Sequence, residues 1–165
     1  MEYIEIKNAS RIVNNSNYVV NNPEKNIGSW HSVFNNNNPI CIEIGMGRGD
    51  FIIEMAKLNP KVNYIGIEIN ASQMVSAVRI LDKAKFTNLK LINMDATYLD
   101  RVFKKEIDTI YLTFPEPWPK GHDEKRRLTH TSYLKLYDKI FKKNKHIILK
   151  TDNKGYFAYS LMSLS

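Results

Sequence analysis

The sequence has 165 residues, of which 43% are hydrophobic and 25% charged, with a formal net charge of +7. This length suits one domain that buries a core without disulfides or metal ions, and the composition excludes wholesale disorder and a membrane protein. The excess positive charge favours polyanionic partners such as nucleic acid. No apolar run approaches the roughly 20 residues that span a bilayer, and residues 1–10 lack the layout of a signal peptide, so we expect a cytoplasmic protein without membrane contact.

The segment before Pro39 is rich in asparagine and shows little periodicity. It ends in four consecutive asparagines at 35–38, which indicates a loop. We therefore divide the chain into an N-terminal extension with a loop, 1–38, and a domain over 39–165. The single cysteine, Cys41, lies in an apolar run, and we predict that it is a buried core residue.

From Pro39 onward, short β-rich runs alternate with amphipathic segments. The predicted strands are 40–44, 62–67, 89–93, 107–112 and 146–150. The predicted helices are 50–58, 72–84, 98–105, 131–143 and 153–161. Such alternation predicts an α/β fold, in which right-handed βαβ units build a doubly wound, mostly parallel sheet. Ligands of such sheets bind at the carboxyl ends of the strands.

A glycine-rich turn follows the first predicted strand. Gly45, Gly47 and Gly49 occupy alternate positions, where the backbone can turn sharply and approach a ligand. The pattern is GxGxG, and Glu43 stands two positions before its first glycine. A carboxylate there would repel a pyrophosphate but can hold the ammonium group of a methionine moiety. The turn therefore disfavours NAD.

Two more acids stand at the ends of the next two predicted strands. Glu68 follows the glycines by roughly twenty residues, the spacing at which doubly wound nucleotide folds place an acid against ribose hydroxyls. Asp95 follows the strand 89–93 and can accept a hydrogen bond from an adenine amino group, although a turn-forming aspartate explains it equally well. Three successive strand-end acids favour an adenosyl pocket.

The segment after the fourth predicted strand has the most distinctive composition. Three prolines fix the backbone around Glu116 and Trp118, which suits a rigid loop that faces a substrate. Trp118 offers a stacking face for a base. Basic residues that can neutralise phosphates follow at Lys120, Lys125, Arg126 and Arg127.

These motifs resemble those of the tRNA (guanine-N7)-methyltransferase family, in which a PDPWPK-type segment precedes KRR and, after the next strand, Thr-Asp. The corresponding segments here are PEPWPK at 115–120, KRR at 125–127 and Thr151-Asp152. The resemblance implies a Rossmann-like class I fold that uses S-adenosyl-L-methionine (SAM), with tRNA as substrate. It assigns SAM to Glu43, Gly45, Gly47, Glu68, Asp95 and Glu116, catalysis to Glu116, and substrate contacts to Lys120 and Asp152.

Guanine N7 carries a lone pair and no proton, so its methylation needs no general base and no metal ion. The four histidines show no metal-ligand spacing. We therefore expect Glu116 to orient the guanine edge and to offset the positive charge that develops on the purine.

Two departures from the family pattern bear on activity. Glu116 replaces the usual aspartate and is one methylene longer, and the family continues beyond the last predicted helix with a strand hairpin. We therefore expect a sheet without its last strands, with 146–150 as an exposed edge. One alternative is an impaired or inactive RNA-binding protein that keeps the methyltransferase fold. Another is a class I methyltransferase with a different substrate, which the PWPK and KRR segments disfavour.

Overall fold

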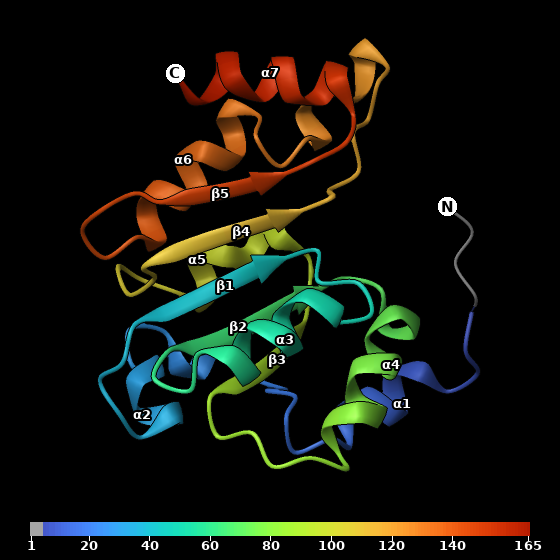
Figure 1. The fold of residues 1–165 in the computed structure, drawn as a ribbon, viewed down its shortest axis with the longest axis vertical. Coiled ribbons are helices and arrows are strands. Elements are labelled where there is room, and N and C mark those ends of the chain that lie inside the picture. Colours follow the sequence, from blue (N-terminus) through green and yellow to red (C-terminus); the bar gives the residue numbers. More distant parts are fainter. Residues whose placement is uncertain (1–4) are drawn as a thin grey trace.

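The computed structural model describes residues 5–165, and these residues form one parallel sheet in the order β3-β2-β1-β4-β5 (Figure 1). The strands are β1 (Ile40–Ile44), β2 (Asn63–Glu68), β3 (Leu89–Asn93), β4 (Thr109–Thr113) and β5 (Ile147–Lys150). Each neighbouring pair is parallel, so the carboxyl ends of all five strands meet at one edge. The predicted doubly wound α/β fold is confirmed.

Helices cover both faces of the sheet (Figure 1). One face packs against α1 (Ala9–Asn14), α3 (Asp50–Leu58) and α4 (Ala71–Leu81). The other packs against α2 (Trp30–Phe34), α5 (Leu99–Val102) and α6 (Thr131–Ile140). The last helix, α7 (Lys154–Leu164), lies beside the β5 end of the sheet.

Alternate side chains of β1 enter the two core clusters. Ile40, Ile42 and Ile44 join the α2 side, whereas Cys41 joins the α3 and α4 side. Successive side chains of a strand point to opposite faces, and both faces of this sheet are covered, so the whole strand is apolar apart from Glu43. Cys41 is buried as predicted, and this burial raises the pKa of its thiol to about 11.

The predicted strands and helices are present, with shifts at their ends. The helix predicted over 98–105 is shorter, because a 3-10 turn (Ala96–Tyr98) leads into α5 and the chain becomes extended at Phe103. The helix predicted over 131–143 ends at Ile140, because Phe141 is extended and bridges Ile107. Local propensity did not reveal these tertiary contacts.

The segment before Pro39 has more structure than its composition predicts. It forms α1, a 3-10 turn (Pro23–Asn26) and α2, while the first four residues of the predicted extension lie outside the described residues. The buried carboxylate of Glu106 fixes this segment to the domain. It accepts hydrogen bonds from the backbone N–H groups of Gly28 at 2.7 Å, Trp30 at 3.0 Å and Lys104 at 2.8 Å.

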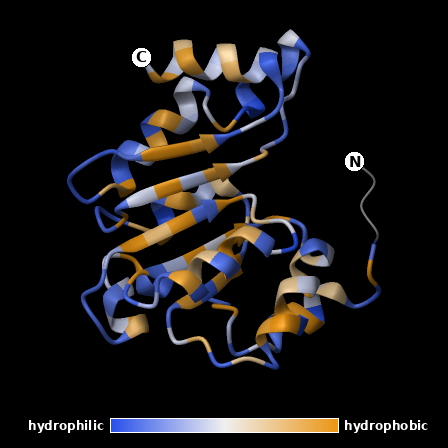
Figure 2. Cartoon of the chain, viewed as in Figure 1, coloured by the Kyte–Doolittle hydropathy of each residue, from blue (hydrophilic) through white to orange (hydrophobic). Residues whose placement is uncertain are grey.

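Strand β5 lies at one edge of the described sheet, as predicted for 146–150, and pairs there with β4. Ile148 on this strand is exposed, as are Phe157, Leu161 and Met162 on α7. Figure 2 shows this apolar character on α7, where orange alternates with paler residues. Within residues 5–165 every helix is too short or too polar to cross a membrane.

Candidate cofactor and substrate site

The candidate site lies where the strand order reverses. The chain passes from β1 to β2 on one side and later enters the sheet again at β4 on the other side of β1. In doubly wound sheets the crevice outside the carboxyl ends of such strands is the usual ligand site. The glycine turn, residues 45–49, follows β1 there, and the proline-rich loop, residues 114–120, follows β4.

The glycine turn requires its glycines for two different reasons. Gly45, Gly47 and Gly49 all have positive φ, at 79°, 56° and 88°. A Cβ on Gly49 would also lie 2.8 Å from the Cβ of Ala77, so this glycine lets α3 approach α4. Among residues 5–165, and apart from its chain neighbours, no atom lies within 4 Å of a Cβ placed on Gly45, which leaves space for a ligand.

Glu43 is buried at the end of β1, with 1% of its surface exposed. Its Oε2 accepts a hydrogen bond from the hydroxyl of Thr113 at the end of β4. Its Oε1 is buried without a partner among the described residues. Desolvation is the main cause that raises the pKa of Glu43 to about 7, and the charges of Glu68 and Asp50 add to it. A buried acid beside two other acids favours a cationic ligand group.

Glu68 and Asp95 stand at the same edge, and both have backbone partners. Glu68 accepts from the N–H of Gly47 at 2.9 Å through Oε1 and from the N–H of Asn70 at 2.8 Å through Oε2. Asp95 uses Oδ1 to cap the 3-10 turn, where it accepts from the N–H and the hydroxyl of Thr97 at 2.9 Å each. Each carboxylate oxygen has two acceptor positions, so both acids retain capacity for a ligand.

The proline-rich loop leaves β4 in an unusual conformation. Phe114 and Trp118 have φ of 49° and 43°, values that bulky side chains rarely adopt. The N–H of Phe114 donates to the carbonyl of Lys150 at 2.7 Å, which joins the loop to the end of β5. Glu116 lies exposed between the two strained residues. Such strain tends to occur at functional sites, where surrounding contacts hold it.

The basic residues after this loop differ in their contacts. Lys120 and Lys125 are exposed. The Arg126 guanidinium lies 4.8 Å from the centre of the Trp118 ring, and its Nε lies 3.6 Å from a carboxylate oxygen of Asp123. The Arg127 Nε, in contrast, donates to the carbonyl of Trp118 at 3.0 Å.

Asp152 follows β5 and is exposed just before α7. Because the N–H of Phe114 donates a hydrogen bond to the carbonyl of Lys150, the segment that carries Asp152 starts beside the proline-rich loop. The fold thus gathers the predicted site residues at one edge of the sheet.

Two residues that contact predicted site residues are missing from the sequence predictions. Thr113, the last residue of β4, donates to Glu43, and the rule that strand ends meet at one edge would have identified it. Tyr159 on α7 packs its ring 4.5 Å from the Arg127 guanidinium. No local pattern in the sequence indicates this contact, because the two residues meet only in the folded chain.

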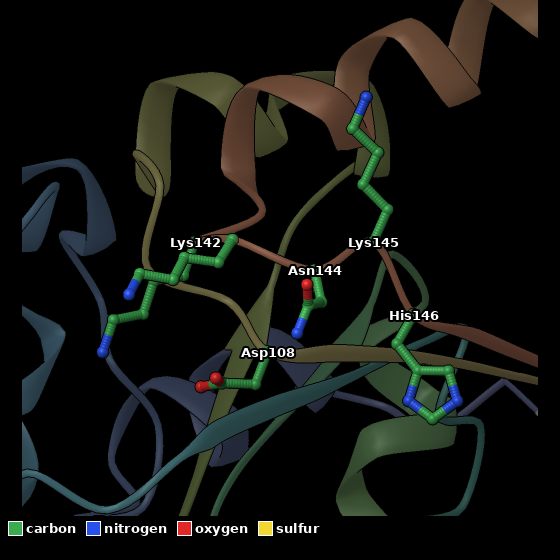
Figure 3. A pocket seen from close by; sticks show the side chains of 6 residues that line it. Asp108, Lys142, Asn144, Lys145 and His146 are labelled. Atoms are coloured by element: carbon green, nitrogen blue, oxygen red, sulfur yellow. The ribbon is translucent and has the colours of Figure 1, made fainter.

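A separate hollow of about 560 Å³ lies at the opposite edge of the sheet (Figure 3). It is lined by Asp108, Lys142, Lys143, Asn144, Lys145 and His146, which precede β4 and β5. Three of these side chains have partners: Asp108 accepts from the N–H of Ile40 at 2.8 Å, Lys145 pairs with Asp138 at 2.9 Å, and His146 Nδ1 lies 3.4 Å from the hydroxyl of Thr109. The hollow therefore belongs to a different surface from the predicted site.

The sheet order and the glycine turn are those of the Rossmann-like methyltransferase fold. A solved structure described as "Structure of an antibiotic related Methyltransferase" aligns with a TM-score of 0.65 and 21% identity, over 81% of this chain and 71% of that one. A 16S rRNA (adenine(1408)-N(1))-methyltransferase from Catenulisporales acidiphilia aligns with a TM-score of 0.59 and 16% identity, over 77% and 57%. These similarities establish the fold alone.

Sequence comparison gives a narrower assignment. Residues 37–165 match the family model described as "Putative methyltransferase". The chain is 50% identical to a tRNA (guanine-N(7)-)-methyltransferase of Geobacillus sp. (strain WCH70), over 90% of this chain and 68% of the relative. It is 46% identical to the enzyme of that name from Bacillus subtilis (strain 168), over 93% and 73%. The chain belongs to the tRNA (guanine-N7)-methyltransferase family, as its motifs predicted.

Proposed function

We propose that this protein transfers a methyl group from SAM to N7 of guanine in tRNA, and that it does so in the cytoplasm. The observation that carries the proposal is the identity of about half of all aligned residues to relatives that bear this activity in their names. The arrangement of acids, glycines and basic residues at the carboxyl edge of the sheet supports it.

The residues at the glycine turn suit SAM, whose sulfonium group supplies an electrophilic methyl. Glu43 Oε1 is a buried acceptor without a partner among the described residues, and it suits the ammonium group of the methionine moiety. The open space above Gly45 lets the backbone approach the ligand. Glu68 would hold the ribose and Asp95 the adenine amino group, each through its remaining acceptor positions. Three nearby carboxylates also attract the positive charge that SAM carries.

Glu116 is our candidate catalytic residue. No proton leaves guanine N7, so this carboxylate has no proton to remove. Its role is to hold the guanine edge in line and to stabilise the positive charge that the purine gains. Asp152, whose segment begins beside the same loop, would complete the guanine contact.

The tRNA would lie across the loop after β4. Lys120, Lys125 and Arg126 are exposed and suit phosphate oxygens, and Trp118 suits a base. The Arg126 guanidinium already stacks on Trp118, so a base would use the other ring face or displace it.

Transfer of labelled methyl from SAM to bulk tRNA, followed by nucleoside analysis, tests the proposed function. We expect 7-methylguanosine as the labelled product. SAM affinity is measured in parallel by calorimetry. SAM and tRNA binding without transfer would instead identify the inactive RNA-binding protein. Transfer to a different nucleoside would identify another class of methyltransferase.

We expect Lys125→Ala to reduce the dependence of tRNA affinity on salt. A phosphate contact releases condensed counterions, so its loss should lower the slope of log K against log salt by about 0.7 to 0.9. Binding titrations at several salt concentrations measure this slope. Lys57→Ala is the matched control, because Lys57 is exposed in the last turn of α3, away from the loop. Equal slopes for both variants and the unmodified protein would remove Lys125 from the tRNA contact.

A further inference from the structure

The loop after β4 cannot hold its shape by local preference. The positive φ values of Phe114 and Trp118 are strained for aromatic side chains, which rarely adopt this region. Such a loop keeps its conformation only if contacts from other parts of the chain fix it. Glu116, our candidate catalytic residue, lies between the two strained positions, so its placement depends on those contacts.

Arg127 contacts the backbone at the far end of this loop. Its Nε donates to the carbonyl of Trp118 at 3.0 Å, and its guanidinium carbon lies 4.5 Å from the centre of the Tyr159 ring. Arg127 is half-buried, whereas Lys125 and Arg126 on the same segment are exposed. Through these two contacts the guanidinium connects the loop to α7.

The backbone that carries Arg127 is itself anchored. The N–H of Arg127 donates to the carbonyl of Glu124 at 3.1 Å. The next residues are fixed by the hydroxyl of Tyr137, which donates to the carbonyl of Leu128 at 2.7 Å, and by the buried pair of Thr129 and Ser160 hydroxyls at 2.7 Å. Arg127 therefore extends from a segment that α6 and α7 hold on both sides.

We propose that Arg127 is a positioning residue, which holds the loop 114–118 in its strained conformation and so places Glu116, and that it does not contact tRNA phosphates. The proposal rests on the function proposed above and departs from the sequence prediction for this one residue. This role requires a planar side-chain group that donates a hydrogen bond in its own plane, to the Trp118 carbonyl, while its face packs on the Tyr159 ring. Arginine does both, whereas the ammonium group of lysine keeps the charge but lacks the planar fork.

The test uses two variants of Arg127: Arg127→Lys keeps the charge, and Arg127→Ala removes it. They are compared with Tyr159→Leu, which removes the ring, and with Lys125→Ala, which removes a proposed phosphate contact. Each variant is assayed for kcat and KM with tRNA, for the salt slope of tRNA binding, and for amide exchange of the segment 114–120 by mass spectrometry. Lys57→Ala serves as the control for loss of a surface charge away from the loop.

We expect Arg127→Lys and Tyr159→Leu to lower kcat, by up to about 100-fold if the loop shifts by about 1 Å. Amide exchange of 114–120 should rise in both variants, while their salt slopes stay at the unmodified value. Lys125→Ala should show the reverse pattern, with a lower slope and unchanged exchange. The two measurements together distinguish a positioning role from a phosphate contact, because the loss of a phosphate contact lowers the salt slope but leaves the loop ordered.

An Arg127→Lys protein with unchanged kcat and unchanged exchange would overturn the proposal. A salt slope that falls in Arg127→Ala as far as in Lys125→Ala would also overturn it, by making Arg127 a phosphate contact. If the unmodified protein does not methylate tRNA but Arg127→Lys still raises exchange, the proposed function fails and the role of Arg127 in fixing the loop stands.

Discussion

Replacing Glu43 with glutamine is expected to weaken SAM binding by about 10- to 100-fold, the loss that follows when a charge-assisted hydrogen bond is removed. The same change should stabilise the ligand-free protein above pH 7. Both effects have one cause, the burial of a carboxylate with one oxygen left unpaired among the described residues. The residue thus favours ligand binding at the expense of the unliganded fold.

The pH dependence follows from the direction of the pKa shift. Burial raises the pKa of Glu43 from its usual value of 4.5 to about 7, so the folded protein holds this proton more tightly than the unfolded chain does. The contribution of Glu43 to the free energy of unfolding is therefore fully present below pH 4.5 and is lost as the pH rises to about 7. Above pH 7 the ionised group costs on the order of 3 kcal/mol, part of which Glu43→Gln should restore. SAM affinity of the unmodified protein should rise over the same interval, because the ligand binds the ionised carboxylate.

Thermal melts and calorimetric SAM titrations at pH 5.5 and pH 8 measure both effects. Glu54→Gln is the matched control, because Glu54 is exposed on α3 and undergoes the same chemical change. Glu54→Gln should leave SAM affinity and the pH dependence of stability unchanged. A Glu43→Gln protein that binds SAM normally at pH 8 would contradict the assignment of Glu43 to the ammonium group.

Trp30→Ala is expected to lower the free energy of unfolding by about 3 to 5 kcal/mol, as for other large aromatic residues removed from a core. Trp30 is fully buried, its ring centre lies 5.2 Å from that of Phe103, and its Nε1 donates to the carbonyl of Val102 at 2.8 Å. Truncation leaves both a cavity and an unpaired buried carbonyl. Urea denaturation followed by circular dichroism measures the loss.

Two variants accompany this experiment. Trp30→Phe removes the indole N–H and less volume, so it should be intermediate and remain folded if Trp30→Ala does not. Trp118→Ala changes the half-buried tryptophan of the loop and should stay within about 1 kcal/mol of the unmodified protein. A loss below about 1 kcal/mol for Trp30→Ala would mean that the segment before Pro39 unfolds separately from the sheet.

The sequence by itself determined the fold class, because the alternation of apolar strands and amphipathic helices admits few arrangements other than a doubly wound parallel sheet. Strand-end chemistry also placed Glu43, Glu68 and Asp95 at one edge, since parallel strands all end on the same side. The PEPWPK and KRR segments then indicated the family that the comparisons confirm. All of these inferences need only local pattern and chain direction.

Only the tertiary structure decided which side chains meet. Trp30 lies in the segment predicted as an extension with a loop, and no sequence pattern marks Glu106. The fold buries both, and the backbone N–H of Trp30 donates to the Glu106 carboxylate. The guanidinium carbon of Arg127 lies 4.5 Å from the centre of the Tyr159 ring, although no sequence pattern joins their segments. Its Nε also donates to the carbonyl of Trp118, and Arg127 is half-buried whereas its neighbours Lys125 and Arg126 are exposed. Such contacts join residues distant in sequence, and their energies depend on burial and geometry that exist only once the chain has folded.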